Sequence, residues 1–132
     1  MKETLLTAAK EAMQKAYAPY SGVFVGAALL GESGKIYTGC NVENAAYSPS
    51  NCAERTAIFK AVSEGERTFS AIAIVGGKGG NITDFFPPCG VCRQVMLEFC
   101  TGDFKIYLTD GNTTQELTLA ELTPHGFTAD KI

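Results

Sequence analysis

Two short cysteine-containing segments constrain this chain more than any other feature: Cys52-x-Glu54 and Pro88-Cys89-x-x-Cys92. Together they offer three thiolates, which bind zinc strongly and lose their protons to it. A tetrahedral zinc with three protein ligands keeps its fourth position open, which is typical of catalytic rather than structural zinc. We therefore expect Cys52, Cys89 and Cys92 to ligate one catalytic Zn²⁺, so the two segments must meet in the folded chain.

Glu54 follows the first cysteine by two residues and is expected to have a different role. It lies too close to Cys52 along one helical turn to be an easy second ligand. A zinc ion lowers the pKa of the water that it binds, so hydroxide is available near neutral pH. Glu54 could take the proton from that water and deliver it to a nitrogen of the substrate. The alternative interpretation is that Cys89 and Cys92 form a redox pair or half of a structural zinc site.

Length and composition fit a single globular domain. The 132 residues leave room for a core, and shares of 45% apolar and 19% charged residues are ordinary for a folded protein. We expect no signal peptide, because the start of the chain carries an acid and lacks a long apolar run. No stretch is long enough to span a membrane. Cys40 and Cys100 are expected to be buried free thiols, and reduced cysteines favour a cytoplasmic location.

The charge of the chain bears on its partners. The net charge is −3, and the 11 basic residues are scattered along the sequence. A protein that holds a polynucleotide backbone needs clustered lysine and arginine to displace counterions. We therefore expect no nucleic-acid partner and a small-molecule substrate without several phosphates.

Hydrophobic periodicity predicts alternating helices and strands within one domain, residues 1–132. The predicted helices span residues 4–16, 52–63, 89–99 and 118–122. The predicted strands span residues 23–30, 35–40, 70–75, 105–108 and 115–117. The longest predicted loops span residues 41–51 and 76–88. This order predicts an α/β fold in which a mixed five-stranded sheet carries helices on both faces, in three α/β/α layers.

Both cysteine segments open predicted helices, which affects the charge of the metal site. Zinc with three thiolates carries a net negative charge, and each helix N-terminus contributes roughly half a positive charge that offsets it. Arg55, next to Glu54, could donate hydrogen bonds to a cysteine sulfur. The alternative is that Arg55 is an ordinary surface cation on its helix.

Five separated motifs resemble those of the short, homotetrameric cytidine deaminases. They are Tyr17–Ser21, Val25–Leu29, Gly39–Tyr47, Cys52–Ala57 and Pro88–Gln94. Zinc deaminases share a Cys-or-His-x-Glu segment and a Pro-Cys-x-x-Cys segment, with the glutamate off the metal. The resemblance runs from about residue 4 to Phe127. It implies a cytidine-deaminase-like fold, a homotetramer, and hydrolytic deamination of cytidine and deoxycytidine in pyrimidine salvage.

The resemblance also implies a role for each site residue. Cys52, Cys89 and Cys92 match the family's zinc ligands, and Glu54 matches its proton shuttle. Arg55 falls in the same motif.

A second set of residues matches the family's substrate contacts. Asn41 and Glu43 match the pair that binds the ribose 3′-hydroxyl, although ordinary turn residues are the alternative interpretation. Ala46 and Tyr47 belong to the same substrate loop. The backbone N–H of Ala53 matches a contact to the carbonyl oxygen of the base.

Two further contacts follow from the resemblance. The carbonyl of Pro88 would accept a hydrogen bond from the departing amine, a role that needs only the backbone. Phe127 matches an aromatic residue that packs on the base from a neighbouring subunit, with core packing of the C-terminal segment as the alternative.

The sequence departs from the family at two places. Relatives usually read Phe-x-Val-Gly in the first strand, whereas here Val23 takes the phenylalanine position and Phe24 follows it. In a strand, a shift by one residue turns a side chain to the opposite face. Either Val23 packs on the base with a weaker contact, or a bulge lets Phe24 reach it. The second departure is the loop 76–87, which is longer than in short relatives and has no assigned role.

Three other functions compete with cytidine deamination. The first is deamination of a modified nucleoside or a nucleoside antibiotic, although the ribose-binding pair Asn41 and Glu43 favours an intact ribose. The second is an editing deaminase on tRNA or DNA, which the acidic charge disfavours. The third is a zinc-stabilised binding protein without catalysis, in which Glu54 would have no purpose.

Overall fold

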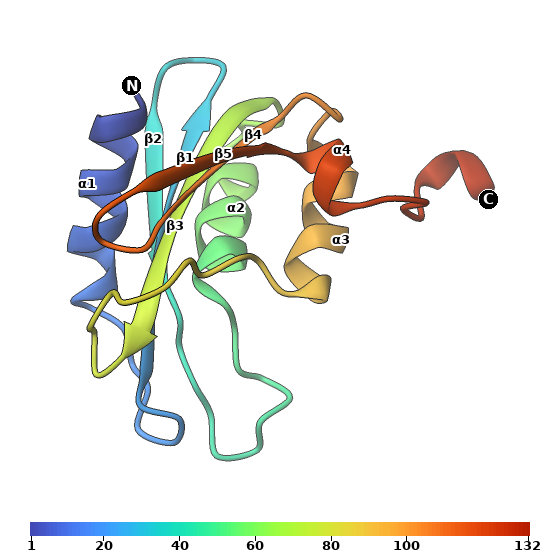
Figure 1. Cartoon of the computed structure of the whole chain (residues 1–132). Coiled ribbons are helices and arrows are strands. Elements are labelled where there is room, and N and C mark those ends of the chain that lie inside the picture. The colour runs from blue at the N-terminus through green and yellow to red at the C-terminus, as the bar shows by residue number, and fades with distance from the viewer.

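The computed structural model describes residues 1–132 as a five-stranded mixed sheet with helices on both faces (Figure 1). The strands lie in the order β2-β1-β3-β4-β5. Their bounds are β1 Val23–Gly31, β2 Ile36–Cys40, β3 Phe69–Lys78, β4 Lys105–Thr109 and β5 Thr114–Thr118. Strands β3 and β4 are parallel, and every other neighbouring pair is antiparallel. The predicted mixed five-stranded α/β fold is confirmed.

The helices divide between the two faces of the sheet (Figure 1). Helix α1, Lys2–Met13, covers one face, while α2, Ala53–Ser63, and α3, Gly90–Phe99, cover the other. Each face has its own apolar cluster. Under α1 it contains Leu5, Leu6, Ala9, Met13, Ala28, Ala71, Ala73 and Val75. The larger cluster, under α2 and α3, includes Leu29, Ile58, Ile72, Ile74, Met96, Ile106 and Leu108. These two cores separate the three layers that the sequence predicts.

Helix α1 ends earlier than the predicted boundary at residue 16. The backbone N–H of Tyr17 donates to the carbonyl of Asn41 at 3.0 Å, and the N–H of Glu43 donates to the carbonyl of Tyr17 at 2.9 Å. The chain leaves the helix to make these two hydrogen bonds. They are tertiary contacts, and they outweigh the helical periodicity of the sequence. As a result, the segment that follows β2 is tied to the entry into β1.

Strand β3 extends past the predicted boundary at residue 75. Residues 76–78 pair with β1, so the prediction of a loop beginning at Gly76 is wrong for these three positions. Glycine is a weak strand former, but a Cβ at Gly77 would lie 1.8 Å from the carbonyl oxygen of Asn81. The following loop folds back onto the strand, and this close approach requires glycine.

Gly39 allows α2 to pack directly on β2. A Cβ at Gly39 would lie 2.5 Å from the carbonyl oxygen of Ala53 and 2.6 Å from the backbone nitrogen of Ala57. The first turn of α2 therefore rests against the backbone of the sheet. This contact fixes the position of Cys52 and Glu54 at the start of the helix.

The C-terminal segment contains a short helix α4, Leu119–Leu122, and a 3₁₀ turn, Ala129–Lys131. Thr118 caps α4: its hydroxyl accepts from the N–H of Glu121 at 3.2 Å, and the Glu121 carboxylate accepts from the N–H of Thr118 at 2.8 Å. None of the helices combines the length and the apolar character that crossing a bilayer requires.

Candidate active site

The two cysteine segments meet because each occupies the start of a helix on the same face of the sheet. Cys52 is the N-cap of α2, and Cys89 is the N-cap of α3. Neither side chain makes a capping hydrogen bond, so both sulfur atoms are available for other partners. A helix N-terminus favours negative charge and thiolates. Both caps therefore place potential thiolates at the positive end of a helix.

The three sulfur atoms are arranged as zinc ligands require. The Sγ atoms of Cys52, Cys89 and Cys92 all lie within 4.8 Å of one another, and those of Cys52 and Cys89 are 3.7 Å apart. A tetrahedral zinc with Zn–S bonds of about 2.3 Å needs sulfur atoms about 3.8 Å apart. A disulfide would need about 2.05 Å. The cluster fits a zinc ion and does not fit a disulfide.

Hydrogen bonding divides the charge unequally among the sulfur atoms. The pKa of Cys52 falls to about 5, because its thiolate accepts hydrogen bonds from Cys92 and Arg55. The pKa of Cys92 rises, because its thiol donates to Cys52 and is buried. A bound cation would favour the thiolate at all three positions.

Arg55 lies against the sulfur cluster rather than in solvent. Its Nη2 donates to Sγ of Cys52 at 3.2 Å. Burial disfavours the charged guanidinium, but hydrogen bonds to Cys52 and Cys92 raise the pKa of Arg55. The Nε atom of Arg55 is buried without a hydrogen-bond partner. The guanidinium thus contacts the sulfur cluster, as predicted from the position of Arg55 in the sequence.

Glu54 is a buried carboxyl group that opens onto a cavity. Only 2% of the residue is exposed, and burial raises the pKa of its carboxyl to about 7. A group that titrates near neutrality can both accept and release a proton during a reaction. Its environment is therefore suited to proton transfer.

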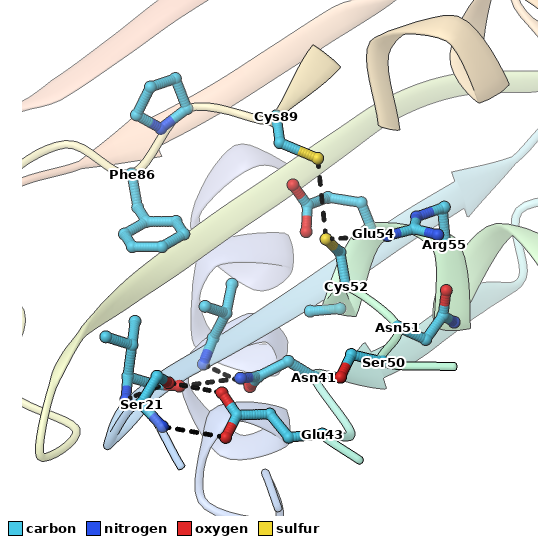
Figure 2. Close-up of a pocket in the computed structure, with 14 residues that line it drawn as sticks. Ser21, Asn41, Glu43, Ser50, Asn51, Cys52, Glu54, Arg55, Phe86 and Cys89 are labelled. Atoms are coloured by element: carbon cyan, nitrogen blue, oxygen red, sulfur yellow. Dashed lines mark hydrogen bonds between the residues drawn. The ribbon is translucent and has the colours of Figure 1, made fainter. Parts of the chain in front are cut away.

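The cavity beside Glu54 has a volume of about 410 Å³, within the range of small-molecule sites. Figure 2 shows Cys52, Cys89, Glu54 and Arg55 at one end of it. Its lining residues are Ser21, Val23, Val25, Asn41, Glu43, Ser50, Asn51, Cys52, Ala53, Glu54, Arg55, Phe86, Pro87 and Cys89. The cavity joins an apolar floor from β1 to polar groups at both ends.

Glu43 and Asn41 form the end of the pocket away from the sulfur atoms (Figure 2). The Glu43 carboxylate accepts from the hydroxyl of Ser21 and from the N–H groups of Tyr20 and Ser21 at 3.0 and 3.1 Å. These bonds, led by the Ser21 hydroxyl, lower its pKa. Asn41 holds the start of β1: Oδ1 accepts from the N–H of Val25, and Nδ2 donates to the carbonyl of Val23, each at 2.8 Å. Ionised and fixed, Glu43 can accept hydrogen bonds from a ligand.

A sequence model of one protein family, described as "Cytidine and deoxycytidylate deaminase zinc-binding region", matches residues 1–108. The chain belongs to this family. Its zinc-binding character agrees with the cluster of Cys52, Cys89 and Cys92, which could hold the ion. The family consists of zinc-dependent hydrolases, so the zinc cofactor predicted from the sequence is confirmed.

Similar proteins extend the match over nearly the whole chain. The cytidine deaminase of Sporosarcina psychrophila is 50% identical over 131 residues, covering 98% of this chain and 93% of that protein. The cytidine deaminase of Halalkalibacterium halodurans is 49% identical over 132 residues, covering 98% of this chain and 96% of that protein. The crystal structure of cytidine deaminase from Burkholderia pseudomallei superposes with a TM-score of 0.88 at 45% identity, covering 96% of this chain and 99% of that chain.

Not every predicted substrate contact lies in the pocket of this deaminase fold. Ala53 lines it, at the first helical position, where a backbone N–H has no acceptor within the helix. Tyr47 lines an adjoining hollow with Tyr20, is 72% exposed, and lies next to Ala46. Pro88 is buried, and its carbonyl accepts from Nε of Arg93 at 2.7 Å. One lone pair of that oxygen is left for a second donor.

Phe127 lies away from the pocket of its own chain. It is 56% exposed, and its carbonyl accepts from Nε2 of Gln94 on α3 at 2.8 Å. It lines a small hollow with Leu97 and Ile132. Phe127 therefore does not line the pocket of its own chain.

The two alternatives for the first strand are resolved by its pairing. Val23 lines the pocket, whereas Phe24 packs with the cluster under α1 on the opposite face. The register between β1 and β3 is continuous there and shifts only between Leu30 and Gly31. The hypothesis of a bulge that brings Phe24 to the base is wrong.

The sequence assigned no individual role to six of the lining residues: Ser21, Val25, Ser50, Asn51, Phe86 and Pro87. Phe86 is the only aromatic residue among them, and it lies in the loop 76–87. A signal was available: the segment leads directly into Pro88 and Cys89, so it must pass close to the metal site.

Proposed function

We propose that this protein removes the 4-amino group of cytidine and deoxycytidine by hydrolysis, yielding uridine or deoxyuridine and ammonia. The observation that carries the proposal is the buried carboxyl of Glu54, which opens onto a pocket beside three convergent cysteine sulfur atoms. The names of the similar proteins support the same reaction.

Cys52, Cys89 and Cys92 would hold the zinc ion, and the ion supplies a water of lowered pKa when it is bound. The two helix N-termini and Arg55 supply positive charge around the three thiolates. They thereby limit the negative charge that would otherwise weaken the Lewis acidity of the site.

Glu54 would carry two protons in sequence. It first takes a proton from water and gives it to ring nitrogen 3, while the water oxygen bonds to carbon 4 of the base. It then takes the remaining hydroxyl proton and gives it to the amino group, so the bond from carbon 4 to nitrogen breaks and ammonia leaves. A carboxyl whose pKa lies near 7 can perform both transfers.

The remaining contacts would orient the nucleoside. We assign the ribose 3′-hydroxyl to Asn41 and Glu43 at the end of the pocket away from the sulfur atoms, with Ala46 and Tyr47 at its rim. The N–H of Ala53 would donate to the carbonyl oxygen of the base. The carbonyl of Pro88 would accept from the departing amine.

A homotetramer would complete the site, because Phe127 would reach the base of a neighbouring subunit. Phe127 is exposed and does not line the pocket of its own chain, and both observations support this assignment. Other exposed apolar side chains, including Tyr17, Val42 and Phe59, offer surface for such contacts.

The proposed partner is a free nucleoside rather than a nucleic acid, since the net charge is −3. All five cysteines are free, which agrees with a reducing compartment. We place the enzyme in the cytoplasm, in pyrimidine salvage.

Ultraviolet monitoring of cytidine conversion tests this function. The zinc-loaded protein should convert cytidine and deoxycytidine, and removal of zinc by a chelator should abolish the conversion. Zinc-loaded protein that leaves both nucleosides intact would contradict the proposal. Conversion of a base-modified nucleoside alone would favour the antibiotic-deaminase alternative.

A further inference from the structure

Phe86 is the only aromatic residue among the 14 that line the pocket. It lies between β3 and α3, shortly before Cys89. Figure 2 shows its ring turned away from its own backbone, into the space between Cys89 and Ser21. The residue is half-buried, because it also packs against the apolar cluster under α2 and α3. The protein therefore holds the ring in place while part of it stays open to a ligand.

Gly76 on β3 provides the space in which this ring sits. A Cβ at Gly76 would lie 2.9 Å from Cγ of Phe86 and 3.1 Å from Cγ2 of Val25. Gly76 does not have a positive φ, so its backbone conformation does not demand glycine. The requirement comes first from the ring of Phe86 and then from the side chain of Val25.

The first strand supplies no aromatic side chain to this pocket. Val23 and Val25 line it, and Phe24 faces the cluster under α1. The floor from β1 thus consists of small branched side chains. The one flat apolar side chain of the pocket, Phe86, comes instead from the segment before Cys89.

We propose that Phe86 packs against the pyrimidine ring of the substrate, and that Gly76 positions it for this contact. The proposal rests on the function proposed above. Aromatic rings attract one another in offset or edge-to-face arrangements, beyond the area that they bury. Phe86 and Cys89 lie on one short segment, so the same segment carries the proposed base contact and the expected metal ligand. Phe86 thereby provides the packing on the base for which the side chain of Val23 is too small.

Steady-state kinetics of Phe86→Leu test this contact. Leucine keeps an apolar side chain but loses the flat ring, so KM for cytidine should rise about tenfold. The change in kcat should be small, because the contact is made to the base before and during the reaction alike. Zinc content should stay at the wild-type level.

Phe85→Leu is the matched control. Phe85 is also half-buried against the same apolar cluster, but it does not line the pocket. Its KM should stay at the wild-type value. Gly76→Ala should also raise KM for cytidine. The KM of the double variant Gly76→Ala/Phe86→Leu should not exceed the higher KM of the two single variants.

A relocation experiment separates a base contact from a merely structural role. The double variant Val23→Phe/Phe86→Leu restores one ring to the pocket, on β1 instead of the loop, and should recover most of the lost affinity. A wild-type KM in zinc-loaded Phe86→Leu would overturn the proposal, and so would an equal rise in Phe85→Leu. If the wild-type protein left cytidine intact, the proposed function would fail instead. Calorimetric titration with cytidine would then still show whether Phe86→Leu weakens binding.

Discussion

At the scale of single residues, the charge around the sulfur atoms decides how the site can work. Zinc with three thiolates carries a net negative charge, which makes it a weaker Lewis acid. Arg55 is the only lysine or arginine that lines the pocket, and it donates directly to Cys52. Its hydrogen bond draws electron density from sulfur and so from the metal.

Arg55→Gln should keep the zinc ion but lower turnover of cytidine by about 10–100-fold, the usual effect of losing a partner of a metal ligand. The measurements are zinc per chain and kcat. Arg67→Gln is the control, since Arg67 is exposed and does not line the pocket. An unchanged kcat in Arg55→Gln would make Arg55 an ordinary surface cation.

Cys89→Ala should lose zinc and lower stability, because two sulfur atoms hold the ion much less tightly than three. Cys100→Ala is the comparison: burial raises the pKa of Cys100 to about 12, which makes it an inert thiol. Metal analysis after gel filtration checks both variants. A full complement of zinc in Cys89→Ala would show that the ion is held elsewhere.

At the scale of elements, two helix N-termini converge because each helix packs closely on the same face of the sheet. For α2 the contact is Gly39, which lets the first turn of the helix touch β2. The position of Cys52 therefore depends on a residue that never meets the metal.

Gly39→Ala should destabilise the protein by about 1–3 kcal/mol, because the added methyl overlaps the carbonyl of Ala53. Thermal unfolding checks it. Gly102→Ala is the control, since a Cβ there would meet only Ala120 at an ordinary 3.4 Å. Equal melting temperatures for the two variants would contradict the packing argument.

The order of elements could be predicted because periodicity is local and strong. Leu5, Ala9 and Met13 repeat at helical spacing, and they are among the residues that α1 buries. The extension of β3 could not be predicted, because glycine carries no strand signal. Only the folded structure shows that Gly77 pairs with β1 and that the carbonyl of Asn81 lies against it.

The convergence of Cys52, Glu54 and Cys89 at one pocket could likewise be predicted, because these residues lie in short motifs with fixed spacing. Phe86 could not, since its contact with the pocket depends on how a long loop returns to the sheet. The residues nearby indicate only that this segment passes close to Cys89, and not which of its side chains enters the pocket.

At the scale of the whole molecule, the active site of one chain is incomplete if Phe127 packs on the base bound by a neighbouring subunit. Phe127→Ala should raise KM for cytidine, because the variant loses aromatic packing with a free energy of roughly 1–3 kcal/mol. Light scattering on the wild-type protein should give the mass of four chains. A monomer at micromolar concentration with full activity would contradict both parts.

The variant Glu54→Gln tests whether Glu54 transfers protons in a zinc-dependent deamination. Glutamine keeps the size of the side chain and cannot exchange protons. Cytidine deamination, zinc content and melting temperature should be measured on the same sample of the variant. We expect wild-type zinc content, a folded protein and a loss of activity of about 10²–10⁴-fold or more. Activity above about a tenth of wild type, with zinc in place, would contradict it.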